Sequence, residues 1–301
     1  MDSPVTRREP ATRSAHVEGA LVAHDGVRLF RQGWIPEKTS ATVVLLHGAG
    51  EHGGRYPDLV STLTAHGYAV CAPDLRGHGR SEGDRGHVDR FSDYVRDLDL
   101  VLETLASPAD PLGHRVRGLP VHLLGYSLGG LIAATVALAR QSTLTSVIGV
   151  APALGPGARV SRPQLAAARA FGVLAPRLSL VRLDPTEMMQ DPAAVRAYLA
   201  DPLIYRGRFD ARLLAEFVGA ISRLQRHASR LRLPLLVLHG RGDLTASPHA
   251  SQLLVDRAGS PDKRLLLYDG VRHSLLHEAR RDQAQADITE WLDRHAEEHR
   301  P

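Results

Sequence analysis

A single hydroxyl lies between two glycines in the segment Gly-Tyr-Ser-Leu-Gly, residues 125–129. The apolar run 121–126 before it is typical of a buried strand, and residues 128–140 after it read as a helix. A turn this tight brings the residues two before and two after the serine together, so both must be small. The hydroxyl of Ser127 then faces a helix N-terminus, which favours developing negative charge. The segment predicts a nucleophile, and the alternative is a serine that only caps the helix.

A serine nucleophile needs a base to take its proton and an acid to orient that base. In a strand–serine–helix arrangement the expected chain order is serine, acid, histidine. We predict Asp243 as the acid, because it follows the apolar run 233–240, and His273 as the base, because it follows the run 263–270. The competing acids are Asp269, at the next strand end, and Asp256 and Asp262, which look like surface residues. The competing bases are the other histidines after Asp243: His249, His277, His295 and His299.

The sequence His-Gly-Ala-Gly, residues 47–50, follows the apolar run 42–48. A glycine-rich turn at this point can aim a backbone N–H into the cleft, so we expect the N–H groups of Ala49 and Leu128 to form an oxyanion hole. The alternative is an ordinary strand-to-loop turn. A phosphate-binding loop is not indicated, because the chain has neither Gly-Lys-Ser/Thr nor Gly-x-Gly-x-x-Gly after a strand.

These residues follow elements that alternate between strand and helix. Residues 18–24 and 27–34 predict a hairpin that turns at Asp25-Gly26. Further strands are expected at 42–48, 68–74, 121–126, 144–153, 233–240 and 263–270, with helices at 56–66, 91–105, 128–140, 248–256 and 283–297. This alternation predicts an α/β fold with a mainly parallel sheet covered on both faces, and a ligand site at the carboxyl ends of the strands.

The segment 154–230 departs from that pattern. It contains no convincing strand, and six prolines interrupt its short helical patterns. We interpret it as a helical cap inserted into a core made of residues 17–153 and 231–301, preceded by a flexible tail over residues 1–16.

The composition is that of a soluble globular protein, with 301 residues, 43% hydrophobic and 23% charged. The net charge of +4 comes from arginines scattered among acidic residues, which argues against a nucleic-acid-binding face. The only cysteine, Cys71, excludes an internal disulfide and is expected to be a buried thiol. No apolar run approaches the roughly 20 residues of a membrane span, and the polar N-terminus is not a signal peptide, so we expect a cytoplasmic protein.

Several segments together resemble the α/β-hydrolases, and more narrowly the monoacylglycerol lipase and lysophospholipase group within the serine-aminopeptidase-like hydrolases. They are HGAGEHGGRY (47–56), DLRGHGRSEG (74–83), GYSLGG (125–130), DPLIYRGR (201–208), HGRGD (239–243) and GVRH (270–273). The resemblance implies a central sheet of about eight strands with the cap inserted after the sixth strand. The sequence differs from the pattern of the family it resembles at two positions: Tyr126, where that pattern most often has His, and Leu128, where it commonly has Met.

The resemblance also implies a serine hydrolase that cleaves monoacylglycerol to glycerol and fatty acid, without metal or cofactor. A lysophospholipase or a broad carboxylesterase is the main alternative, and a perhydrolase, an aminopeptidase or a non-catalytic binding protein on the same fold are more remote. Glu51 and Arg55, close to the predicted oxyanion turn, either bind a polar head such as glycerol or pair with each other to steady the loop. The cap is expected to contact a lipid or membrane surface transiently.

Overall fold

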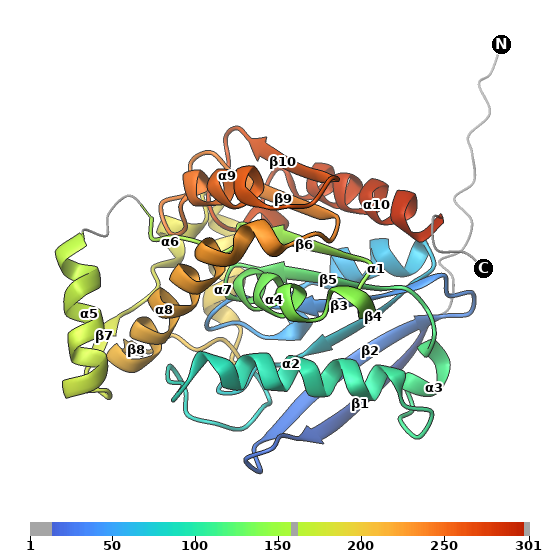
Figure 1. The fold of residues 1–301 in the computed structure, drawn as a ribbon, viewed down its shortest axis with the longest axis horizontal. Helices are drawn as coiled ribbons and strands as arrows, with labels where there is room; N and C mark the ends of the chain where they lie inside the picture. The colour runs from blue at the N-terminus through green and yellow to red at the C-terminus, as the bar shows by residue number, and fades with distance from the viewer. Residues whose placement is uncertain (1–13, 158–161, 298–301) are drawn as a thin grey trace.

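The central element is an eight-stranded sheet with the order β1-β2-β4-β3-β5-β6-β9-β10 (Figure 1). A computed structural model describes residues 14–157 and 162–297. The sheet is built from β1 (Ser14–Val22), β2 (Arg28–Pro36), β3 (Ala41–Leu46), β4 (Tyr68–Pro73), β5 (Val121–Tyr126), β6 (Ser146–Val150), β9 (Leu235–Gly240) and β10 (Lys263–Tyr268). The first two strands pair antiparallel, and β2 pairs antiparallel with β4. All the remaining pairs are parallel, as predicted for an α/β fold.

Helices cover both faces of this sheet. One face carries α2 (Phe91–Ala106), α4 (Leu128–Ala139) and α9 (Pro248–Arg257), and the other carries α1 (Pro57–Ala65) and α10 (Arg281–Glu297). The strands have apolar side chains on both faces because each face meets helices. In β3, for example, Val44 and Leu46 pack under the first set of helices and Val43 and Leu45 under the second. The continuous apolar run of β3 thereby fills both halves of the core.

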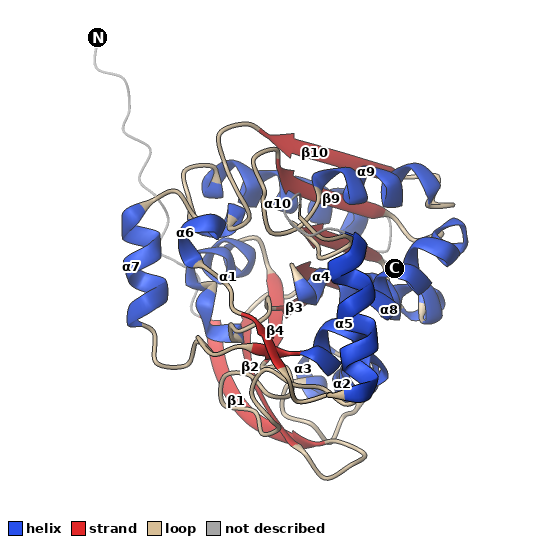
Figure 2. Cartoon of the chain, turned by 90° about the vertical axis from the view of Figure 1, so that its left-hand side faces the viewer, coloured by secondary structure: helices blue, strands red, loops and turns tan. Residues whose placement is uncertain are grey.

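The segment between β6 and β9 contains α5 (Arg162–Leu174), β7 (Ser179–Val181), α6 (Pro185–Met188), α7 (Pro192–Ala200), β8 (Phe209–Asp210) and α8 (Ala211–His227). Figure 2, viewed from this side, shows α6 and α7 to one side and α5 with α8 to the other, in front of the sheet. The expectation that this cap has no strand was wrong, because β7 and β8 form an antiparallel pair. Strands of three and two residues are too short to show an alternating pattern.

The N-terminal expectation also needs correction. Ser14, Ala15 and His16, assigned to the flexible tail, form the start of β1 and pair with residues 34–36 of β2. The rest of that tail, residues 1–13, lies outside the described residues. The predicted hairpin turn is present, with Gly26 at a φ of 86° and the Ala23 N–H donating to the Val27 carbonyl at 2.9 Å. Within the described ranges, no helix is both long enough and apolar enough to cross a bilayer.

Candidate active site

Ser127 occupies the turn between β5 and α4 in a strained conformation, with φ 52° and ψ −112°. A positive φ is costly for a residue with a side chain and marks a position that the surrounding structure holds in place. A Cβ on Gly125 would lie 2.2 Å from the carbonyl oxygen of Gly129, and one on Gly129 would lie 2.2 Å from that of Leu46. The two glycines are therefore required by the close approach of backbone to backbone, as the sequence pattern predicted.

A chain of hydrogen bonds joins Ser127 to two residues more than a hundred positions away. Nε2 of His273 lies 2.9 Å from the Ser127 hydroxyl oxygen, and Nδ1 of His273 lies 2.7 Å from Oδ2 of Asp243. Asp243 follows β9, and His273 follows β10, so parallel pairing of neighbouring strands brings them to one edge. Ser127 is 9% exposed and His273 is 1% exposed, which keeps the arrangement largely out of water.

Asp243 is held as a carboxylate by several donors. Its Oδ1 accepts from the backbone N–H groups of Thr245 at 2.8 Å and Ala246 at 3.0 Å. Burial alone would raise the pKa of Asp243, but the charge on His273 and hydrogen bonds from His239 and His273 outweigh burial and lower it. The acid is therefore ionised and fixed in direction, which is the condition for orienting a histidine.

The competing residues lie elsewhere. Asp269 is exposed and pairs with Arg241 at 3.0 Å, and Asp256 is exposed on α9. Asp262 pairs with His295, which is buried. His249 is exposed in the first turn of α9, and His299 lies outside the described residues.

The loop after β3 lies directly against Ser127. A Cβ on Gly48 would lie 2.8 Å from the ring of Tyr126 and 3.4 Å from Cβ of Ser127. Leu128 opens α4, and the first N–H groups of a helix have no partner within the helix. The backbone of Ala49 and the backbone of Leu128 thus come from two segments that flank Ser127, the arrangement that an oxyanion hole requires.

His47 fixes the shape of that loop. Its Nε2 accepts from the Leu75 N–H at 2.9 Å, and its Nδ1 donates to the Gly48 carbonyl at 2.8 Å. Burial lowers the pKa of His47 to about 4, so the ring is neutral and can accept this bond at neutral pH. His47 therefore links the loop after β3 to the loop after β4.

Comparison with known proteins agrees with this geometry. Residues 37–280 match the family described as "Serine aminopeptidase, S33". The monoacylglycerol lipase of Mycolicibacterium smegmatis is 33% identical over 95% of this chain and 99% of its own length. The human monoglyceride lipase is 35% identical over 85% of this chain and 82% of its own. The crystal structure of Paleococcus ferrophilus monoacylglycerol lipase superposes with a TM-score of 0.79 at 31% identity, covering 89% of this chain and 99% of that one.

This chain belongs to the S33 family of α/β-hydrolases. Within that family it falls in the monoacylglycerol lipase group, as the segments quoted from the sequence indicated.

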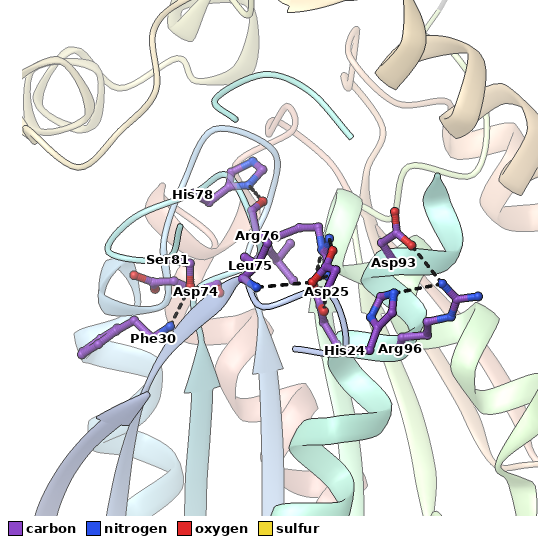
Figure 3. A network of polar contacts seen from close by, with 12 residues as sticks. His24, Asp25, Phe30, Asp74, Leu75, Arg76, His78, Ser81, Asp93 and Arg96 are labelled. Atoms are coloured by element: carbon purple, nitrogen blue, oxygen red, sulfur yellow. Dashed lines mark hydrogen bonds and ion pairs between the residues drawn. The ribbon is translucent and has the colours of Figure 1, made fainter. Parts of the chain in front are cut away.

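The family segment 74–83 supports the predicted oxyanion loop of this hydrolase. Oδ1 of Asp74 accepts from the Gly53 N–H at 2.7 Å, and Oδ2 accepts from the Arg80 N–H at 2.7 Å. Ser81 donates to the Asp74 carbonyl at 2.6 Å and accepts from the Phe30 N–H at 2.8 Å (Figure 3). The segment therefore ties the loop after β3 to the hairpin.

Glu51 and Arg55 of the hydrolase lie together in a buried polar cluster. Glu51 is 1% exposed, accepts from the Tyr56 hydroxyl at 2.5 Å and pairs with Arg55 at 3.9 Å. Burial would raise the pKa of Glu51, but the positive charge of Arg55 is the largest of the effects that lower it below its usual value. Three buried atoms of this cluster have no hydrogen-bond partner within the described chain: Oε1 of Glu51, Nε of Arg55 and Nε2 of His277.

The cap contacts the core loops around this site. The Tyr205 N–H donates to the Gly50 carbonyl at 2.8 Å, and the Ser274 N–H donates to the Met188 carbonyl at 3.1 Å. The Arg55 guanidinium lies over the ring of Tyr198 in α7, 5.3 Å from its centroid. Cap and core are thus joined next to the predicted oxyanion loop and the predicted base.

Sequence reasoning assigned no role to three residues that the structure places against the site, His239, Ser251 and Ser274, and it considered His277 only as a competing base. His239 stands four residues before Asp243 in a quoted segment, which was the available signal. The others come from elements whose side-chain directions only the fold defines. Cys71, by contrast, is a buried thiol as expected, and burial raises its pKa to about 12.

Proposed function

We propose that this carboxylic ester hydrolase cleaves monoacylglycerols to glycerol and a fatty acid, with Ser127 as its nucleophile. The observation that carries the proposal is the continuous hydrogen-bonded path from the Ser127 hydroxyl through His273 to Asp243. A buried imidazole that joins a strained serine to an ionised aspartate is the arrangement that activates a hydroxyl for acyl transfer.

In the first half of the reaction, Nε2 of His273 takes the hydroxyl proton as the Ser127 oxygen attacks the ester carbonyl carbon. Asp243 holds the imidazole in place and stabilises its positive charge. The carbonyl oxygen becomes an oxyanion that accepts from the N–H groups of Ala49 and Leu128. The tetrahedral intermediate then collapses, His273 returns the proton to the leaving alkoxide, and glycerol departs from an acyl-enzyme.

In the second half, His273 takes a proton from water as the water oxygen attacks the acyl carbon. The same two N–H groups stabilise the second oxyanion. Breakage of the acyl–oxygen bond returns the proton from His273 to Ser127 and releases the fatty acid.

A substrate panel tests the assignment. Purified wild type and Ser127→Ala are assayed on monoacylglycerols of several chain lengths, lysophosphatidylcholine, nitrophenyl esters and aminoacyl amides. We expect the highest kcat/KM on a monoacylglycerol, and no activity from a folded Ser127→Ala. Faster turnover of lysophosphatidylcholine or of an aminoacyl amide would refute monoacylglycerol as the preferred substrate. Residual activity in Ser127→Ala would refute Ser127 as the nucleophile.

We further propose that Glu51 and Arg55 bind the glycerol head. Glu51 Oε1 and Arg55 Nε are buried polar atoms without a hydrogen-bond partner in the described residues, and such atoms are satisfied by a ligand or water. Glu51→Gln keeps the volume but removes the charge. We expect it to raise KM for monoacylglycerol more than for a nitrophenyl ester, which has no glycerol. An equal effect on both substrates would instead support the alternative, a pair that only steadies the loop.

The outer face of the cap is proposed to contact lipid. Among the described residues, six exposed large hydrophobic side chains belong to the cap: Phe171, Val173, Leu174, Leu178, Val181 and Leu199. Exposed arginines lie in the same segment, at 169, 177 and 182, and favour an anionic surface. Figure 1 shows α5, which carries Leu174, at the outer edge of the molecule.

Vesicle binding tests this surface. Leu174 is 81% exposed on α5, and Val22 is 64% exposed in the hairpin and serves as a matched control. We expect wild type and Val22→Asp to sediment with phosphatidylcholine–phosphatidylglycerol vesicles, and Leu174→Asp to sediment less. Equal sedimentation of all three proteins, or of none, would contradict a lipid-binding role for the cap.

A further inference from the structure

One oxygen of Asp243 is shared by two histidines. Oδ2 lies 2.7 Å from Nδ1 of His273 and 2.9 Å from Nε2 of His239. His239 is fully buried near the carboxyl end of β9, and its other ring nitrogen, Nδ1, lies 2.8 Å from the hydroxyl oxygen of Ser251 in α9. The path from Ser127 therefore continues beyond the acid for two more side chains.

The proton positions along this path follow from the chemistry of the groups. An ionised carboxylate only accepts hydrogen bonds, so His239 Nε2 carries a proton and donates it to Asp243. In a neutral ring Nδ1 is then an acceptor, and the donor that faces it is the Ser251 hydroxyl. With the two backbone donors on Oδ1, the Asp243 carboxylate accepts four hydrogen bonds.

We propose that His239, held by Ser251, is a positioning residue that fixes the direction of the Asp243 carboxylate and limits how strongly it binds the His273 imidazolium. The proposal rests on the proposed function, in which positive charge must appear on His273. A second donor on Oδ2 shares the negative charge of Asp243, so less of that charge acts on His273. Ser251 hydrogen-bonds to Nδ1 of His239 and thereby fixes the orientation of the ring.

Among the described residues, Tyr126 is a titratable group that also faces this path, with its ring 5.2 Å from that of His273. Burial, and next the charge of Glu51, raises the pKa of Tyr126 well above its usual range, so it remains a neutral phenol. Any pH dependence that follows a change at His239 is therefore carried by Asp243 and His273.

Three variants separate positioning from simple packing. His239→Leu removes the donor and approximately keeps the volume, His239→Gln keeps an N–H donor, and Ser251→Ala removes the group that holds the ring. The reaction rate with a fluorophosphonate probe is measured across the acidic limb of the pH profile, together with kcat/KM for a nitrophenyl ester and the thermal midpoint. His122→Leu is the control, because His122 in β5 is also fully buried and its Nδ1 lies 2.8 Å from the hydroxyl oxygen of Ser146 in β6.

We expect His239→Leu to lower kcat/KM about tenfold or more, since it removes a hydrogen bond to a charged group. Its acidic limb should move to higher pH, because the carboxylate then binds the imidazolium more strongly. His239→Gln should restore both properties. Ser251→Ala should lower kcat/KM less than His239→Leu, with a limb moved in the same direction. His122→Leu should lower the thermal midpoint without moving the limb.

The proposal is wrong if folded His239→Leu has the acidic limb of its pH profile at the same pH as wild type. It is also wrong if His239→Leu and His239→Gln have the same kcat/KM and the same acidic limb. If His239→Leu does not fold, Ser251→Ala decides, and an unchanged limb there contradicts the proposal. A wild type that does not react with the probe would instead refute the proposed function, so the two failures are distinguishable.

Discussion

The phenol oxygen of Tyr126 lies 3.2 Å from the hydroxyl oxygen of Ser274, the residue directly after the predicted base. The same ring packs against the imidazole of His273 at 5.2 Å and is met by the loop at Gly48. A single side chain therefore touches the loop of the proposed oxyanion hole and the loop of the base.

Truncation of Tyr126 should therefore affect activity and stability together. We expect Tyr126→Phe, which loses one hydrogen bond, to cost about 1 kcal/mol of unfolding free energy and to retain most activity. Tyr126→Ala leaves a cavity under His273 and should cost about 3–5 kcal/mol, with a larger loss of kcat. Urea unfolding and nitrophenyl ester kinetics measure both quantities. Full kcat in Tyr126→Ala would show that the ring does not position the base.

A methyl group on Gly125 should disrupt the nucleophile turn. Its Cβ would lie 2.2 Å from the Gly129 carbonyl oxygen, so backbone must move. We expect Gly125→Ala to cost about 1–3 kcal/mol and to reduce fluorophosphonate labelling about a hundredfold, because the Ser127 oxygen is displaced. Gly19→Ala in β1 meets nothing within 4 Å and should match wild type in both measurements. Equal labelling of the two variants would contradict this account of the turn.

The parts of the molecule that sequence predicted well have strong local signals. Continuous apolar runs gave β3 and β9, and the Gly-x-Ser-x-Gly segment gave the turn at Ser127, because close backbone contact restricts these positions to glycine. Chain order and strand ends then indicated Asp243 and His273. These two residues meet Ser127 only because parallel strands end at one edge of the sheet.

Other features depend on tertiary contacts that no local pattern shows. The pair β7–β8 is too short to have a period, and the register of β1 extends to Ser14 because residues 34–36 of β2 offer a partner. His295 is buried in a helix that looks polar, because its ring packs on Trp291 and bonds to Asp262. The position of His239 four residues before Asp243 was a sequence signal, but the proposed role also depends on Ser251, which lies in a helix that follows β9.

The stability of the protein should fall in mild acid because buried histidines are neutral in the folded state. Burial lowers the pKa of His47 and His277 to about 4 and of His78 to about 3, from 6.5 in the unfolded chain. Between the folded-state pKa values and 6.5, these histidines are protonated more in the unfolded state than in the folded state. The free energy of unfolding is therefore highest above about pH 6.5 and decreases as the pH falls toward 4. The effect is up to about 3 kcal/mol for His47 or His277 and up to about 5 kcal/mol for His78.

Urea unfolding at several pH values tests this dependence. His47→Gln keeps an acceptor for the Leu75 N–H but does not titrate, so its stability should fall less steeply between about pH 6.5 and 4. The control is His66→Gln, in which the replaced side chain is 43% exposed, and its unfolding is measured over the same pH range. If the free energy of unfolding of His47→Gln falls with pH as steeply as that of wild type, the acid sensitivity comes from other groups.

The buried ion pair between Arg76 and Asp97 should be the costliest polar contact to break on this face of the sheet. Two guanidinium nitrogens of Arg76 donate to the two Asp97 oxygens, each at 2.6 Å, and a third donates to Asp25 of the hairpin turn at 2.7 Å (Figure 3 shows the contact with Asp25). Loss of one partner leaves a largely buried charge with incomplete compensation, so we expect Asp97→Ala to cost about 3–5 kcal/mol. Asp99, on the same helix α2, pairs with the more exposed Arg140, and Asp99→Ala should cost about 1 kcal/mol or less. Urea unfolding of the two variants gives the comparison, and similar costs would show that Arg76 regains its hydrogen bonds from water or from Asp25.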